Sequence, residues 1–154
     1  MSVRDTARKQ TVRLLDEAAR QVGNVRTPPE GWLATLRKAL RMPVNTLAGR
    51  LGVSRGAVYQ AERNEREGAI TINQLRKLAD AMGGRLVYAI VPETSIADMV
   101  EHQARRKASG RVRRTNAHMA LEQQSLPDEQ ARQRIEDLAE ELARDMPADF
   151  WNDQ

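Results

Sequence analysis

The sequence predicts a mainly α-helical protein with one β-strand and a helical C-terminal extension. Two observations support this fold class. Apolar residues recur at helical spacing along most of the 154 residues. One run, residues 85–91, is rich in β-branched and aromatic side chains and ends at Pro92, as a strand would. We expect three segments: an N-terminal helix over 1–26, a compact domain with the strand over 27–92, and the extension over 93–154.

The composition excludes several classes of protein. The chain has no cysteine, so it has neither a disulfide framework nor a thiolate site. Its two histidines, His102 and His118, lack metal-ligand spacing, and no P-loop or nucleophile elbow is present. We therefore expect no metal, no cofactor and no enzymatic activity. No apolar run approaches the ~20 residues of a membrane span, and the first residues lack a signal-peptide core, so we expect a cytoplasmic protein.

The charge of the chain is unevenly distributed. The formal net charge is +4, but residues 1–118 carry +11 and residues 119–154 carry −7. This division suggests two surfaces with different partners, a basic body and an acidic tail. Ordinary solvated helix faces are the alternative.

Local signals place the helices of the first half. Residues 3–22 predict one helix, and the two prolines in 27–31 make that stretch a linker. A second helix begins at Trp32. Ser54 is the expected N-cap of a helix over 54–63, with a loop at 64–68. Thr71 is the expected N-cap of a helix that ends at Gly83.

The window 44–63 meets the steric requirements of a helix-turn-helix. Ala48 is small where the two helices pack closely, and Gly52 can adopt positive φ in the turn. Val53 and Val58 are expected to hold the second helix against the core. The alternative is an ordinary pair of core helices joined by a glycine turn.

The remaining positions of the second helix form the predicted contact face. These residues are Ser54, Arg55, Gly56, Tyr59, Gln60 and Arg63. In the major groove, Arg can pair with guanine edges and Gln with adenine edges, so the pattern predicts binding to double-stranded DNA. Candidate phosphate contacts outside this face are Thr46, Arg66, Arg105 and Arg106.

The predicted strand at 85–91 needs a partner, because a lone strand cannot satisfy its own backbone hydrogen bonds. The simplest partner is the same strand of a second copy, which would give an intermolecular two-stranded ribbon and a homodimer. Residues 68–72 are a weaker partner within the chain.

The C-terminal extension is expected to be helical. Helices are predicted over 95–107, 111–124 and 127–145, with an interruption at Ser109-Gly110. The basic run at 105–114 either follows DNA phosphates or is solvated. Phe150 and Trp151 either anchor a partner or pack back onto the helices.

The helix-turn-helix region resembles the Xre/Cro-type family. The matching residues are Leu47, Ala48, Leu51, Gly52, Val53, Ser54, Arg55, Val58, Glu62, Arg63, Thr71, Leu75, Leu78, Ala79, Met82 and Gly83. The resemblance, over residues 31–84, implies a lambda-repressor-like domain of five helices that binds operator DNA as a dimer. Val44 stands where the family usually has a phosphate-contacting glutamine, and Ala61 where a larger residue is common.

The chain to about residue 107 is also similar to the family called mobile mystery protein A. The residues that carry this likeness are Gly31, Trp32, Leu33, the run 86–92 and the run 99–106. The resemblance implies an antitoxin partner of a Fic-domain toxin. Ser125 and Glu129 have the spacing of a Fic-inhibitory helix, but Gln130 departs from its final position, and helix capping by Ser125 is the alternative.

These observations together predict a sequence-specific transcriptional repressor, and the resemblance to mobile mystery protein A implies that it is the autoregulating antitoxin of a Fic-type pair. The alternatives are a toxin-neutralising protein that acts through its C-terminal region, a stand-alone Xre-type regulator and a non-specific nucleic-acid binder. The expected partners are operator DNA, a second copy and a Fic toxin.

Overall fold

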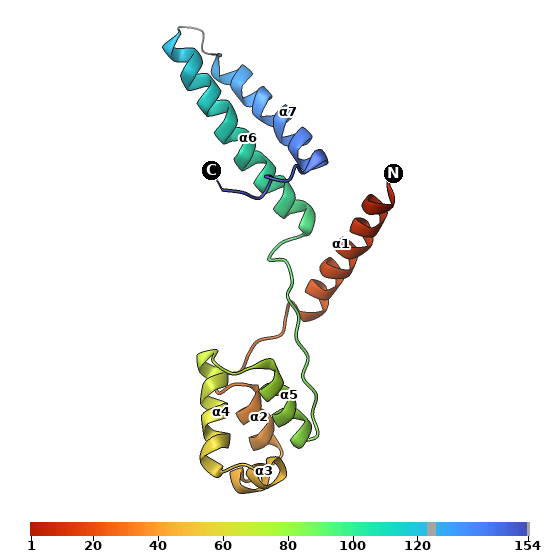
Figure 1. Ribbon diagram of the computed structural model, residues 1–154, viewed down its shortest axis with the longest axis vertical. Coiled ribbons are helices and arrows are strands. Elements are labelled where there is room, and N and C mark those ends of the chain that lie inside the picture. Colours follow the sequence, from red (N-terminus) through yellow and green to blue (C-terminus); the bar gives the residue numbers. More distant parts are fainter. Residues whose placement is uncertain (123–125, 154) are drawn as a thin grey trace. The chain divides into compact units, whose positions relative to one another are not determined.

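The computed structural model of the protein describes residues 1–122 and 126–153. Helices dominate these residues (Figure 1). They are α1 (Val3–Val22), α2 (Trp32–Ala39), α3 (Val44–Leu51), α4 (Arg55–Glu67), α5 (Ile72–Ala81), α6 (Ile96–Leu121) and α7 (Asp128–Asp145). The described residues hold no β-strand, and none of their helices is long and apolar enough to cross a membrane.

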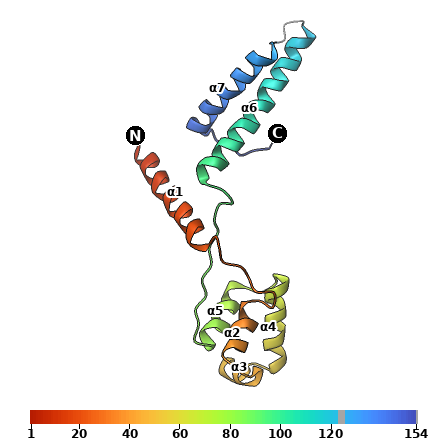
Figure 2. The same cartoon turned by 180° about the vertical axis from the view of Figure 1, so that it is seen from behind.

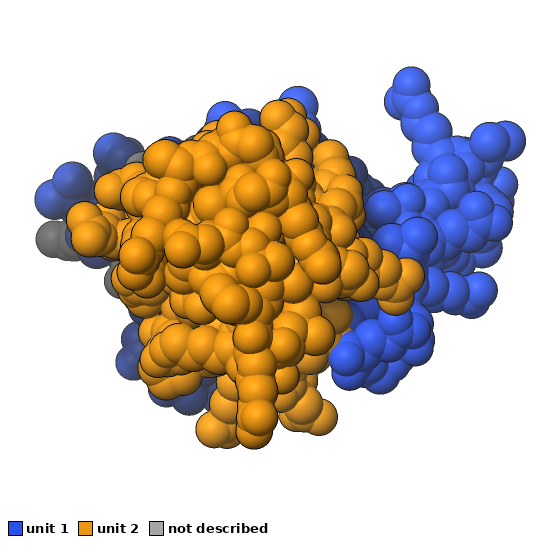
Figure 3. Space-filling view, turned by 90° about the horizontal axis from the view of Figure 1, so that it is seen from below, with its two compact units in different colours: residues 1–21, 91–154 blue, residues 22–90 orange. Residues whose placement is uncertain are grey.

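The chain divides into two compact units (Figure 3). One consists of residues 22–90 and contains α2–α5. The other consists of residues 1–21 and 91–154 and contains α1, α6 and α7. Each unit has its own hydrophobic core.

The unit at 22–90 has four helices rather than the five that the Xre/Cro resemblance implied. Their core is formed by Leu33, Val44, Leu47, Ala48, Val58, Ala61, Leu78 and Met82. After α5, Gly83 has φ +81° and the helix stops. The β-branched and aromatic residues that follow favour extended backbone, so the fifth helix does not form and the five-helix expectation is wrong.

Both predicted N-caps are confirmed. The Ser54 hydroxyl accepts a hydrogen bond of 3.1 Å from the backbone N–H of Ala57, and the Thr71 hydroxyl accepts one of 3.1 Å from Gln74. Each bond satisfies one of the amides that a helix leaves unpaired at its start.

The predicted loop at 64–68 is wrong, because α4 continues to Glu67. The polar residues of this stretch lie on a helix rather than in a turn. The helix ends at Gly68, which has φ +75°, and the carbonyl of Asn64 accepts the amides of Ala69 and Ile70. A left-handed glycine is a common helix end, so Gly68 rather than Asn64 is the stop signal.

The predicted strand at 85–91 is not formed within one chain. Figure 1 shows a long trace without helix between α5 and α6, and residues 85–91 have neither helical nor strand structure. Among the described residues, no backbone group of this segment pairs with another backbone group. The weaker partner expected at 68–72 does not pair with it either. The strand of the predicted fold class is therefore unconfirmed.

The helices α6 and α7 lie side by side as an antiparallel hairpin (Figures 1 and 2). Its core is formed by Val100, Ala104, Ala108, Ala139, Leu142 and Phe150. The predicted interruption at Ser109-Gly110 is wrong, because α6 is one helix of 26 residues. A mid-helix glycine costs only about 1 kcal/mol relative to alanine, and packing against α7 outweighs that cost. The last predicted helix, 127–145, is confirmed as α7.

Candidate nucleic-acid interface

The turn between α3 and α4 is built on Gly52. Its backbone has φ +67° and ψ +32°, and its N–H donates to the carbonyl of Gly49. The next amide, that of Val53, donates to the carbonyl of Ala48 over 3.0 Å. A Cβ on Gly52 would meet nothing within 4 Å, so the backbone conformation alone requires glycine here.

One side of α4 packs into the core and the other is free. Val58, Ala61 and Glu62 are buried, with Val58 only 1% exposed. Ala48 on α3 is also buried, as the close packing of the two helices predicted. Val53 was expected to hold α4 in place, but it is 45% exposed, so that part of the prediction is wrong. It lies in the turn, before the first core-facing position of α4.

All six residues of the predicted contact face are exposed: Ser54, Arg55, Gly56, Tyr59, Gln60 and Arg63. The guanidinium of Arg55 lies 5.7 Å from the centre of the Tyr59 ring, a cation–π distance. The Gln60 amide nitrogen donates to the Asn64 side-chain oxygen over 2.8 Å. Both contacts hold long polar side chains on the outer face of the helix.

A buried ion pair joins α2 to α4. The Arg37 Nε donates to Glu62 Oε1 over 2.6 Å, and its Nη2 donates to Oε2 over 3.2 Å. Both side chains are buried, and the hydrogen bonds to Glu62 raise the pKa of the Arg37 guanidinium above its ordinary value. The two parallel hydrogen bonds fix the rotation of α4 about its own axis.

A second carboxylate on α4 caps α2. The backbone amides of Trp32 and Leu33 donate to the two Glu65 oxygens over 2.6 and 2.8 Å. Gly31 at the N-cap has φ +86°, and a Cβ there would lie 3.0 Å from the Glu65 carboxylate. Glycine is thus required at position 31 both by the backbone and by the approach of Glu65.

The sequence contains a sign that α2 is capped from elsewhere in the chain, and it was not used to predict the helices. The start of α2 has no Ser, Thr, Asp or Asn at the N-cap position, only Gly31. The first amides of a helix need an acceptor, so an acceptor from elsewhere in the chain is required. Glu65, three residues after Glu62, supplies it. From the sequence, Glu65 was expected in a polar loop, and Glu62 was matched only to the family pattern.

Two of the candidate phosphate contacts lie in the same unit as α4. Thr46 on α3 and Arg66 on α4 are both exposed. Val44, at the position where the resembled family has glutamine, is only 7% exposed and belongs to the core. The nearby Arg50 donates to the carbonyl of Ala81 over 2.9 Å, which ties α3 to the end of α5.

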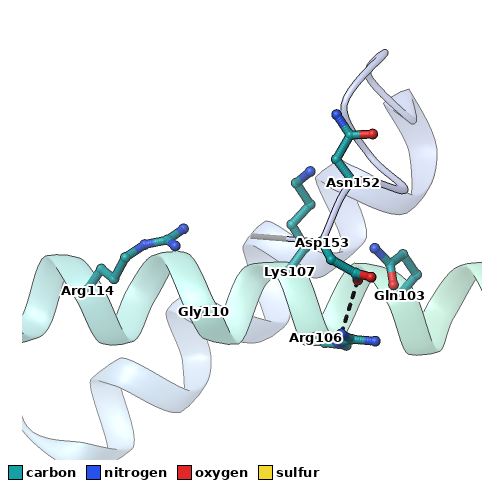
Figure 4. A pocket seen from close by; sticks show the side chains of 7 residues that line it. All are labelled: Gln103, Arg106, Lys107, Gly110, Arg114, Asn152 and Asp153. Carbon is teal, nitrogen blue, oxygen red and sulfur yellow. Dashed lines mark hydrogen bonds and ion pairs between the residues drawn. The ribbon is translucent and has the colours of Figure 1, made fainter.

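The other two candidates, Arg105 and Arg106 on α6, are paired with acids of their own unit. Arg105 lies 2.8 Å from Glu136, and Arg106 lies 3.1 Å from Asp153. Figure 4 shows the second pair beside Lys107, on the face of α6 that the C-terminal residues cover. A phosphate would have to replace these carboxylates, so the assignment of both arginines as phosphate contacts stays a prediction.

The residues after α7 fold back onto α6. Phe150 is fully buried in the hairpin core, whereas Trp151 is 55% exposed. The buried side chains of Gln103 and Lys107 donate to the carbonyls of Phe150 and Asp149. Of the two interpretations of the aromatic pair, packing back onto the helices therefore holds for Phe150.

The Fic-inhibitory spacing is only partly visible. Ser125 lies outside the described residues, and Glu129 is exposed in the first turn of α7. A negative charge in the first turn stabilises a helix by interaction with its dipole, and this role of Glu129 requires no partner protein.

One part of the chain, the α2–α5 unit, matches a known family. Residues 33–88 match the family model described as helix-turn-helix. Searches of curated proteins and of solved structures each gave no match. The wider likeness to mobile mystery protein A stays a prediction. The match covers most of α2, all of α3–α5 and the Gly52 turn between α3 and α4. Residues 33–88 therefore form a helix-turn-helix domain.

Proposed function

We propose that the protein is a sequence-specific DNA-binding transcriptional regulator that acts as a repressor. The observation that carries this proposal is the outer face of α4, where six polar or small residues are exposed while the opposite side is buried. Helix-turn-helix domains insert this second helix into the major groove. The match of residues 33–88 to the helix-turn-helix family supports the same function.

The chemistry of the face fits base reading. Arg55 and Arg63 can donate two hydrogen bonds to guanine, and Gln60 can pair with adenine. Gly56 adds no side chain, so the helix backbone can approach the base edges closely. Thr46 and Arg66 lie at exposed positions suited to the phosphates on either side of the groove.

A second function is proposed for the other unit, the neutralisation of a Fic-type toxin. Its support is the family resemblance, together with the separate core of the α6–α7 hairpin and the exposed Trp151. Under this proposal the regulator is the antitoxin that represses its own operon. Deletion of residues 94–154 would then abolish protection of cells against the toxin and leave the α2–α5 domain to bind DNA.

The DNA proposal is tested with the double variant Arg55→Ala/Gln60→Ala. The matched control is Gln74→Ala/Arg76→Ala, which removes one glutamine and one arginine from exposed positions on α5. We expect the α4 variant to lose specific binding to the promoter of its own gene in a gel-shift assay. The α5 variant should retain it. Equal binding by both variants would contradict the assignment of the face.

A further inference from the structure

Residues 85–91 have unpaired backbone groups and exposed apolar side chains. Val87 is 67% exposed, Tyr88 64% and Ile90 88%. No backbone group of the segment bonds to another backbone group among the described residues. Such a segment leaves both its apolar side chains and its donors and acceptors open to a second strand.

The described part of the chain offers no strand of its own to cover the segment. The weaker partner considered at 68–72 is already committed, because the amides of Ala69 and Ile70 donate to the carbonyl of Asn64. Ile72 then begins α5. The helices use their backbone groups internally, and the linker at 23–31 makes no backbone hydrogen bond to residues 85–91.

We propose that residues 85–93 pair with the same residues of a second copy in an antiparallel two-stranded ribbon, with Ala89 on the two-fold axis. Two identical segments related by a two-fold axis perpendicular to them run antiparallel. With Ala89 at the centre, Arg85 lies opposite Glu93 of the second copy, and Tyr88 lies opposite Ile90.

Charge complementarity selects this register. Arg85 and Glu93 have opposite charge, and neither makes an ion pair within the described part of its own chain. The register forms two Arg–Glu pairs per dimer, one at each end of the ribbon. A register centred on Tyr88 would instead place Arg85 opposite Val91 and leave both charges unpaired across the strands.

The side-chain pairs inside the ribbon agree with this choice. Tyr88 opposite Ile90 is an aromatic and β-branched pair, and Val87 opposite Val91 is a β-branched pair. Pro92 has no amide to donate, so in this register it lies opposite Leu86 at a pair that takes no hydrogen bond from it.

The inference concerns self-association and does not depend on DNA binding. Its first test is disulfide cross-linking, which the chain suits because it has no cysteine of its own. Single variants Ala89→Cys, Tyr88→Cys and Ile90→Cys are oxidised mildly in solution. The control is Ala97→Cys, at an exposed position on α6.

The proposed register predicts a specific pattern of cross-links. Ala89→Cys should give a covalent dimer on its own, because residues directly opposite across two strands have Cβ atoms about 4.5–5.5 Å apart. Tyr88→Cys and Ile90→Cys should each stay largely monomeric but cross-link when mixed. Efficient dimers from Tyr88→Cys alone would overturn the register, and no excess over Ala97→Cys for any variant would overturn the ribbon.

A charge exchange provides the second test. Arg85→Glu and Glu93→Arg should each weaken the dimer several-fold, because each places like charges opposite one another at both ends. The double variant Arg85→Glu/Glu93→Arg restores opposite charges and should recover the dissociation constant, measured by analytical ultracentrifugation. Circular dichroism checks that each variant is folded. A double variant no tighter than the single variants would overturn the pairing of these two residues.

Discussion

The Arg37 guanidinium and the Glu62 carboxylate form a buried, doubly hydrogen-bonded ion pair between α2 and α4. Glu62 lies on the core side of the helix whose outer side carries the predicted DNA contacts. The pair therefore connects the position of those contacts to the first helix of the domain. Glu65, one turn later, holds the start of α2 in the same way.

We expect Glu62→Leu to destabilise the domain by about 3–5 kcal/mol, because it leaves the buried Arg37 charge without a partner. Arg37→Met combined with Glu62→Leu should recover much of that loss. Hydrogen exchange of the α4 amides measures the local stability. The matched control is Lys38→Ala, which breaks the exposed pair with Glu30 and should cost less than about 1 kcal/mol. Equal losses for Glu62→Leu and Lys38→Ala would show that the buried pair has no special role.

Gly31→Ala should destabilise the domain through two separable effects. Positive φ costs a non-glycine residue about 1 kcal/mol, and the new Cβ would lie 3.0 Å from the Glu65 carboxylate. In a Glu65→Ala background only the first effect remains. Denaturant unfolding of the four proteins of this cycle should therefore give a smaller cost for Gly31→Ala when Glu65 is absent. Strict additivity would contradict the close contact.

Replacing Gly52 or Gly110 with alanine should change stability in opposite directions, although both positions have room for a Cβ. A Cβ added to Gly52 or to Gly110 would meet no atom within 4 Å, but only Gly52 has positive φ, +67°. Gly110→Ala should stabilise the hairpin by about 0.5–1 kcal/mol through helix propensity. Gly52→Ala should destabilise the helix-turn-helix by about 1 kcal/mol. Thermal unfolding followed by circular dichroism compares them, and a shift of the same sign for both would contradict the account.

The two neighbouring aromatic residues near the C-terminal end should differ sharply in their contribution to stability. Phe150→Ala empties a fully buried position in the α6–α7 core and should cost about 3–5 kcal/mol. Trp151→Ala removes a side chain that is 55% exposed and should cost much less. Limited proteolysis of the hairpin reports the difference. Equal protease resistance in both variants would place Phe150 outside the core.

Local rules predicted the parts of the fold that short-range chemistry decides. The caps at Ser54 and Thr71 and the left-handed Gly52 each depend on a few neighbouring residues, and all three are confirmed. Long-range contacts were not predictable in the same way. The continuity of α6 through Gly110 depends on α7, and the capping of α2 depends on Glu65, which lies far along the chain on α4.

The uneven charge of the chain is explained by contacts that charge counting could not predict. Acids that follow residue 119 pair with cations of α6: Glu136 with Arg105, Asp153 with Arg106, and Asp149 with both Lys107 and Arg111. Part of the basic run and part of the acidic tail thus pair with each other within one unit. The sequence had suggested separate partners, because charge sums carry no information on which groups meet in space.

The most direct test of the central claim is the affinity of the full chain for its promoter duplex and for a scrambled duplex, measured by fluorescence anisotropy over a range of salt concentrations. The account predicts tighter binding to the promoter, and predicts that Arg55→Ala/Gln60→Ala reduces the affinity to that for the scrambled duplex at every salt concentration. Equal affinity of the unaltered chain for both duplexes, varying only with salt, would contradict sequence-specific recognition by α4.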